Sequence, residues 1–226
     1  MKYLLVAHGT RKQRGVTMVG NIAEQVSAVL GQHVHVAFVD VLGPTPSEVL
    51  ASLDGPVTAV PAFLSRGYHV TTDIPAHVLA SGHPDVTVTE ALGPGPQLVR
   101  VLADRLVESG WRRDDSVVLA AAGTSDPGAQ RDLHTMATWL SATTSSRVEL
   151  AFAATGTPRV ADAVDAMRRR GARRVAVASY LLAEGLFQDR LRASGADVVT
   201  EPLGTHPGLV RLIASRFRRA RVPLAA

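Results

Sequence analysis

The 226-residue sequence contains no cysteine. This absence excludes disulfide bonds, a thiol nucleophile, zinc bound by thiolates and an iron–sulfur cluster held by cysteines. A metal ion must then be bound by His, Asp, Glu or backbone oxygen atoms. Apolar runs are also short, since none approaches the roughly 18–20 residues that a membrane span requires. The N-terminal stretch has too few apolar residues for a signal peptide, so we expect a cytoplasmic protein with no membrane partner.

Aromatic residues are scarce, at 4% of the chain, and the net charge is only +4. Two basic clusters occur, "RRRGARR" at 168–174 and "RFRRAR" at 216–221. Each lies at the end of a helical pattern, where cations suit the negative end of the helix dipole. Neither cluster has the interleaved aromatic side chains that stack on bases. We therefore predict that the protein does not bind nucleic acid.

Short apolar runs alternate with amphipathic stretches along the whole chain. This alternation, with strands apolar on both faces, is typical of an α/β protein with parallel sheets covered by helices. The strands are expected at 3–7, 34–41, 57–62, 86–91, 116–121, 148–152, 174–179 and 198–200. The helices are expected near 16–30, 46–53, 73–81, 97–108, 128–142, 157–170, 185–193 and 207–219.

The chain also contains an internal repeat. "VAHGT" (6–10) is matched by "AAAGT" (120–124), and "VHVAFVDVLGPTPSEV" (34–49) by "VELAFAATGTPRVADAV" (148–164). "PAFLSRGYHV" (61–70) is matched by "SYLLAEGLFQ" (179–188), and "EALGPGPQLV" (90–99) by "EPLGTHPGLV" (201–210). The repeat of about 110 residues is longer than a solenoid unit. It predicts two similar lobes, 1–112 and 113–226, each a four-stranded parallel sheet flanked by helices.

Three reactive residues of the first copy have inert counterparts in the second. The pairs are His8 with Ala122, Asp40 with Ala154, and His69 with Phe187. His8 and Asp40 end the first and second strands, and His69 lies in the loop after the third. Ligands of open parallel sheets bind outside the carboxyl ends of the strands. Two imidazoles and a carboxylate there favour a metal site with open positions or a set of bases, with the active site in lobe 1–112.

The stretches "LLVAHGTRKQRG", "AFVD" and "LSRGYHVTTDIP" resemble the sirohydrochlorin chelatases, a group of the class II chelatases, in their long two-lobed form. The family inserts a divalent metal into sirohydrochlorin, with iron giving sirohaem and cobalt leading toward cobalamin. The resemblance implies that His8 and His69 are the two active-site histidines. It places Asp40 where the family often has a supporting Glu.

This resemblance implies a lyase whose metal is a substrate, with no permanently bound cofactor and no iron–sulfur cluster. Insertion requires the macrocycle to lose two pyrrole protons while the metal sheds water. A neutral imidazole can accept a proton and can donate a lone pair to Fe²⁺ or Co²⁺. We predict that His8 and His69 are catalytic and bind the metal, with Asp40 as a further ligand or an orienting group. Fe²⁺ is favoured and Co²⁺ is the alternative.

Sirohydrochlorin carries acetate and propionate carboxylates, which guanidinium groups bind in a bidentate manner. Basic residues follow His8 and precede His69, and we expect them to bind the carboxylates. Small and aromatic neighbours of His69 are expected to shape the site, with glycine allowing a close approach to a flat ring. The predicted substrate-binding residues are Arg11, Lys12, Arg14, Ser65, Arg66, Gly67 and Tyr68.

Two other functions use the same residues. A tetrapyrrole or metal carrier would bind through the same ligands without turnover. A histidine-type phosphatase would need an Arg before the His-Gly turn, where this chain has Ala7, so that Arg11 would have to substitute. A monomer is expected to suffice, and a dimer stays open.

Overall fold

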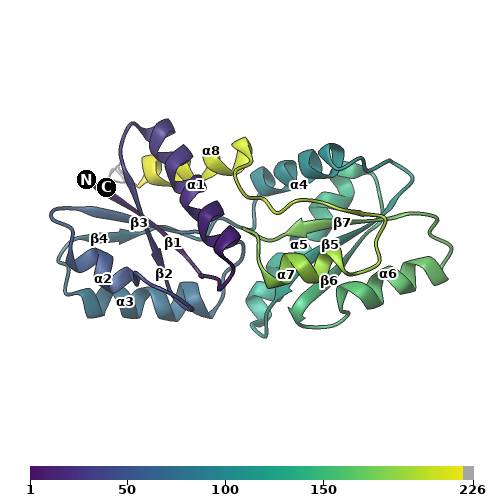
Figure 1. Cartoon of the computed structure of the whole chain (residues 1–226), viewed down its shortest axis with the longest axis horizontal. Coiled ribbons are helices and arrows are strands. Elements are labelled where there is room, and N and C mark those ends of the chain that lie inside the picture. Colours follow the sequence, from purple (N-terminus) through teal and green to yellow (C-terminus); the bar gives the residue numbers. More distant parts are fainter. Residues whose placement is uncertain (221–226) are drawn as a thin grey trace. The chain divides into compact units, whose positions relative to one another are not determined.

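The computed structural model, which describes residues 1–220, contains two four-stranded sheets in which all paired strands are parallel (Figure 1). Helices flank both sheets. The predicted fold class is confirmed. The two sheets belong to two compact units, one formed by Met1–Leu92 with the segment from Thr205 on, and one formed by Gly93–Gly204.

The first unit has the strand order β2-β1-β3-β4. Its strands are β1 (Lys2–Ala7), β2 (Val34–Phe38), β3 (Val57–Pro61) and β4 (Val86–Val88). Its helices are α1 (Gln13–Leu30), α2 (Pro46–Ala51), the π-helical turn η1 (His69–Asp73), α3 (Ile74–Ser81) and α8 (Pro207–Arg219). Helices α1 and α8 cover one face of the sheet, and α2 and α3 cover the other (Figure 1).

The second unit repeats this plan with the strand order β6-β5-β7-β8. Its strands are β5 (Ser116–Gly123), β6 (Val148–Thr155), β7 (Val175–Tyr180) and β8 (Val198–Val199). Its helices are α4 (Pro96–Glu108), α5 (Pro127–Thr144), α6 (Val160–Arg169) and α7 (Leu186–Arg192). The same strand order in both units confirms the internal repeat read from the sequence.

The central strands explain why the apolar runs of the sequence do not alternate. In β1, the side chains of Tyr3, Leu4, Leu5 and Val6 are all fully buried, although successive residues point to opposite faces of the sheet. Both faces must therefore be covered by helices. This requirement accounts for the amphipathic helix after almost every strand.

The compact units differ from the expected lobes 1–112 and 113–226 in one respect, because the last helix of each repeat packs in the other unit. Helix α4 contacts α5 and β7, and α8 contacts α1 and β3. The ring of Phe217 in α8 lies 4.7 Å from that of Tyr3 in β1, between ring centroids. The periodicity of a helix gives its apolar face but does not say which sheet that face covers. The predicted boundary at residue 112 separates the two sequence repeats, whereas the compact units have exchanged the last helix of each repeat.

The two basic clusters both lie near helix ends, α6 for 168–174 and α8 for 216–221, of which residue 221 is outside the described residues. Within residues 1–220, every helix is either too short or too polar to span a bilayer.

Candidate functional site

His8 and Asp40 lie side by side at the carboxyl edge of the first sheet. His8 directly follows β1, and Asp40 lies two residues after β2, which ends at Phe38 rather than at the predicted residue 41. The Asp40 N–H donates to the carbonyl of His8 at 3.0 Å. Gly9 makes this approach possible: its φ is +98°, and a Cβ there would overlap the Asp40 carbonyl oxygen. Only glycine meets both demands without strain.

His69 reaches the same edge from the other side of β1. It is the first residue of η1, whose widened turn is closed by a hydrogen bond from the Ile74 N–H to the His69 carbonyl. The preceding loop is fixed by the Gly67 carbonyl, which accepts from the N–H groups of Val70 and Thr71 at 2.9 and 3.0 Å. Single π-helical turns within α-helices occur frequently at functional sites.

The structure brings the two predicted catalytic histidines together. The ring centroids of His8 and His69 are 4.6 Å apart, and the rings are nearly perpendicular, at 88°. The Nδ1 atom of His8 lies 3.1 Å from the Gly9 carbonyl oxygen, which can only accept. A hydrogen bond at this contact requires the proton on Nδ1, which leaves Nε2 of a neutral ring as the lone-pair donor. The ring of His69 is stacked on Phe63, with 5.8 Å between centroids, and its Nδ1 contacts Asp73.

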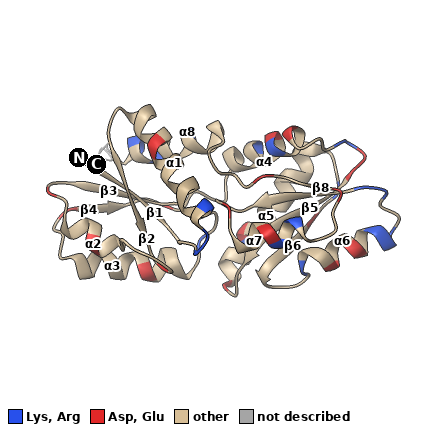
Figure 2. Ribbon diagram, viewed as in Figure 1, with Lys and Arg blue, Asp and Glu red and all other residues tan. Residues whose placement is uncertain are grey.

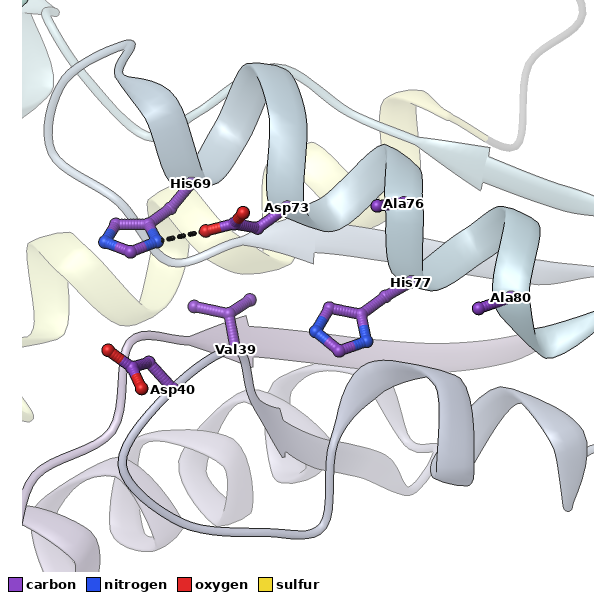
Figure 3. Close-up of a pocket in the computed structure, with 7 residues that line it drawn as sticks. All are labelled: Val39, Asp40, His69, Asp73, Ala76, His77 and Ala80. Carbon is purple, nitrogen blue, oxygen red and sulfur yellow. Dashed lines mark hydrogen bonds and ion pairs between the residues drawn. The ribbon is translucent and has the colours of Figure 1, made fainter.

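A pocket of about 440 Å³ lies beside His69, between α3 and the segment after β2 (Figure 3). Figure 3 shows Asp40 and His69 at one end of it, and His77 and Ala80 at the other. His77 Nδ1 lies 3.1 Å from the Ser47 Oγ. Asp73 and His77 were not among the predicted site residues. Their spacing of four and eight residues from His69 was the signal that could have found them, since it places all three on one helix face.

The third predicted metal ligand, Asp40, does not complete a metal cage. Its Oδ1 accepts a hydrogen bond from the Val41 N–H at 2.7 Å. Among the 220 residues that the structure describes, no three His, Cys, Asp or Glu side chains are grouped so as to hold a metal ion. The arrangement therefore offers two imidazoles as nitrogen donors, and a role for Asp40 as a ligand stays a prediction.

The predicted substrate-binding residues fall on two segments next to the histidines. Figure 2 shows basic residues at the beginning of α1, where the exposed Arg11, Lys12 and Arg14 lie just after His8. Ser65, Arg66, Gly67 and Tyr68 form the loop before η1. Tyr68 is 67% exposed, although it is a large aromatic residue. Both segments are thus at the surface next to the two rings.

The fold requires glycine at position 9 but not at position 67. The φ of Gly67 lies outside the left-handed region, and a Cβ at this position would meet no atom within 4 Å. The space that a side chain at position 67 would occupy is therefore open.

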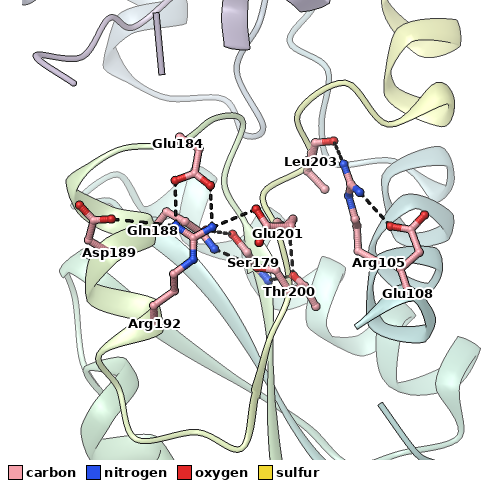
Figure 4. Close-up of polar contacts among 10 residues, drawn as sticks. All are labelled: Arg105, Glu108, Ser179, Glu184, Gln188, Asp189, Arg192, Thr200, Glu201 and Leu203. Atoms are coloured by element: carbon pink, nitrogen blue, oxygen red, sulfur yellow. Dashed lines mark hydrogen bonds and ion pairs between the residues drawn. The ribbon is translucent and has the colours of Figure 1, made fainter. Parts of the chain in front are cut away.

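The corresponding edge of the second unit is closed by internal polar contacts (Figure 4). The buried Gln188 accepts from Ser179 Oγ at 2.6 Å and donates to the Thr200 carbonyl at 2.8 Å. Next to it, Arg192 binds the carboxylates of Glu184 and Glu201 at 2.6 and 2.9 Å. Hydrogen bonds to Glu184, followed by those to Glu201, raise the pKa of Arg192. The polar groups of this edge are thus paired with one another.

One protein-family model matches the chain twice, once in each copy of the repeat. The CbiX family model matches residues 2–109 and 116–220 of the chain. A sirohydrochlorin ferrochelatase of Priestia megaterium is 25% identical over 235 residues, which covers 95% of this chain and 88% of that protein. A sirohydrochlorin cobaltochelatase of Methanothermobacter thermautotrophicus is 28% identical over 127 residues, covering 46% of this chain and 88% of that protein.

The fold is also similar to that of a solved structure, SirB from Bacillus subtilis with Fe³⁺. The TM-score is 0.82 at 20% sequence identity, and the match covers 97% of this chain and 95% of that one. The similarity extends over both units of the chain.

Proposed function

Because the chain belongs to the CbiX family, we propose that it is a chelatase that inserts a divalent metal ion into sirohydrochlorin. The observation that carries the proposal is the pair of imidazoles, 4.6 Å apart, at the carboxyl edge of the first sheet. Two curated relatives, named a ferrochelatase and a cobaltochelatase of sirohydrochlorin, support the same substrate.

In this proposal His8 and His69 deliver the metal and receive the protons. Two neutral imidazoles are borderline ligands that bind Fe²⁺ or Co²⁺ and leave positions for water and pyrrole nitrogens. As the metal passes to the macrocycle, each released ring nitrogen can accept one of the two pyrrole protons. A site with only two strong donors suits delivery, because a closed cage of four ligands would retain the ion.

The charged segments next to the histidines supply the binding energy for the polyanionic substrate. Arg11, Arg14 and Arg66 offer guanidinium groups for its carboxylates, and Lys12 adds a further positive charge. Asp40, at the end of the pocket next to His69, is then available to orient water on the incoming metal or to bind it.

Multiple turnover is the test that separates an enzyme from a carrier. Protein is mixed under anaerobic conditions with a large excess of sirohydrochlorin and of Fe²⁺, and loss of the free macrocycle's absorption is followed. A chelatase consumes many equivalents of macrocycle per protein. Consumption that stops at one equivalent would identify a tetrapyrrole or metal carrier instead.

We further propose that Fe²⁺ is the preferred metal and Co²⁺ an accepted alternative. The donor set itself does not discriminate strongly between them, because imidazoles bind both ions. Initial insertion rates with each metal alone, at equal free concentration, test this ranking. A higher rate with Co²⁺ than with Fe²⁺ would reverse it.

A further inference from the structure

We infer that Asp73 is a positioning residue of the site, which holds His69 in the one tautomer that presents its Nε2 lone pair to the metal. The role of the Nε2 lone pair in metal binding rests on the proposed function. The contact between Asp73 and His69 is observed independently of it. Asp73 was not among the residues that the sequence pointed to.

The geometry is a short hydrogen bond within one turn of helix. Asp73 Oδ2 lies 2.6 Å from His69 Nδ1, and Figure 3 shows the carboxylate aimed at that nitrogen. Both side chains are only partly exposed, at 28% and 34%. Phe63 stacks on the His69 ring, with 5.8 Å between the ring centroids. The His69 ring thus lies between an aromatic neighbour and the Asp73 carboxylate.

A carboxylate selects between the two neutral forms of the ring. An ionised carboxylate can accept a hydrogen bond but cannot donate one, so the nitrogen that faces it must carry the proton. In water a neutral imidazole favours the opposite form, with the proton on Nε2. Asp73 reverses this preference, as carboxylates behind metal-binding histidines do in general. The contact between His8 Nδ1 and the Gly9 carbonyl favours the same form of the His8 ring.

The second copy of the repeat has lost both members of the pair. With Gly67 matched to Gly185, His69 corresponds to Phe187 and Asp73 to Leu191. Leu191 is fully buried in the core of its unit. Asp73 directly precedes α3, but its side chain makes no capping hydrogen bond to that helix. Loss of the acid together with the histidine points to one functional pair.

The first test is the tautomer of His69, read from the ring ¹⁵N shifts and couplings at a pH at which the ring is neutral. We expect Nδ1–H in the native protein and a shift to Nε2–H in Asp73→Ala. Asp73→Leu, which copies the residue of the second unit, gives the same test if the alanine variant folds poorly. Asp54→Ala, which removes an exposed acid from another loop of the same unit, should leave the His69 signals unchanged.

The second test is Co²⁺ affinity of the protein alone, measured by titration. Loss of a carboxylate behind a metal-binding histidine reduces metal affinity by about 10–100-fold, and we expect this range for Asp73→Ala with no change for Asp54→Ala. An Nδ1–H ring together with native Co²⁺ affinity in a folded Asp73 variant would overturn the inference. Neither measurement uses sirohydrochlorin, so a failure of the proposed chelatase activity is seen separately, as absent turnover in the native protein.

Discussion

At the scale of single residues, the site depends on which ring nitrogens are already occupied. His8 and His69 come from different loops, yet each has its Nδ1 hydrogen-bonded within the protein, to a carbonyl in one case and to a carboxylate in the other. The Nε2 atoms are left for ligands. Two local contacts thus orient both rings in the same way, as the proposed metal site requires.

The glycine at 67 gives a residue-scale prediction about substrate binding. Because a Cβ at this position meets nothing in the protein, Gly67→Ala should fold with native stability. It should nevertheless raise the KM for sirohydrochlorin, since the added methyl group occupies the space that a flat ring would approach. Thermal unfolding measures the stability of the variant, and steady-state kinetics measure its KM. An unchanged KM would remove Gly67 from the binding surface.

The glycine at 9 gives the opposite prediction. Gly9→Ala forces a left-handed φ on alanine and pushes its methyl group into the Asp40 carbonyl. We expect a loss of more than about 1 kcal/mol in the free energy of unfolding. Denaturant unfolding measures it, and stability equal to that of Gly67→Ala would contradict a steric need for glycine in this turn.

At the scale of elements, the two sheets have the same strand order but differ in the segment after the third strand of each. After β3 the loop leads to η1 and the histidine, whereas after β7 it leads to α7 and a buried amide. The second edge has thus become a structural one, held by Ser179, Gln188 and Thr200.

This difference predicts that a variant of the second edge loses stability but keeps the rate of metal insertion. Gln188→Ala leaves the buried Ser179 hydroxyl and Thr200 carbonyl without their present partner, at a cost of about 1–3 kcal/mol for an unsatisfied buried group. Urea unfolding should detect this loss. The rate of metal insertion at a temperature where the variant is folded should match that of the native protein, and a large loss of rate would assign this edge a role in catalysis.

The start of β7 predicts a dependence of stability on pH. The Val175 N–H, and after it Arg168, hold the pKa of Asp197 below its usual value. A depressed pKa in the folded state contributes stability above the unfolded value, and this contribution is lost as the pH falls through the folded pKa.

The expected result is a difference between the native protein and Asp197→Ala of about 1 kcal/mol at pH 7. The difference should shrink below about pH 4, where an unfolded Asp is protonated. Urea unfolding at a series of pH values measures it. A difference that is constant from pH 7 to pH 3 would show that charge on Asp197 is not its source.

At the scale of the whole molecule, most of the architecture could be predicted because it repeats. Strands buried on both faces leave continuous apolar runs, and the match of "VAHGT" with "AAAGT" set the two copies in register. The same register showed which reactive residues the second copy lacks. The structure places His8, Asp40 and His69 at one edge of the first sheet, and their roles stay predictions.

The features that could not be predicted depend on contacts between distant segments or on local helix geometry. The exchange of α4 and α8 is a choice between two similar sheets, and the apolar faces of these helices do not encode it. The π-helical turn at His69 is a local departure from α-helical geometry that the sequence pattern does not encode. The four-residue spacing of His69 and Asp73 is compatible with one helix face, but their hydrogen bond emerged only from the structure.

The central claim is that the first copy of the repeat carries the active site through His8 and His69, which the second copy lacks. The variants His8→Ala and His69→Ala test this claim most directly. The measurement is the initial rate of anaerobic Fe²⁺ insertion into sirohydrochlorin by each folded variant, beside the native protein. We predict a fall of at least about 100-fold in both, the lower end of the rate gain that a proton-accepting group contributes. A rate within about threefold of the native value in either variant would contradict the claim.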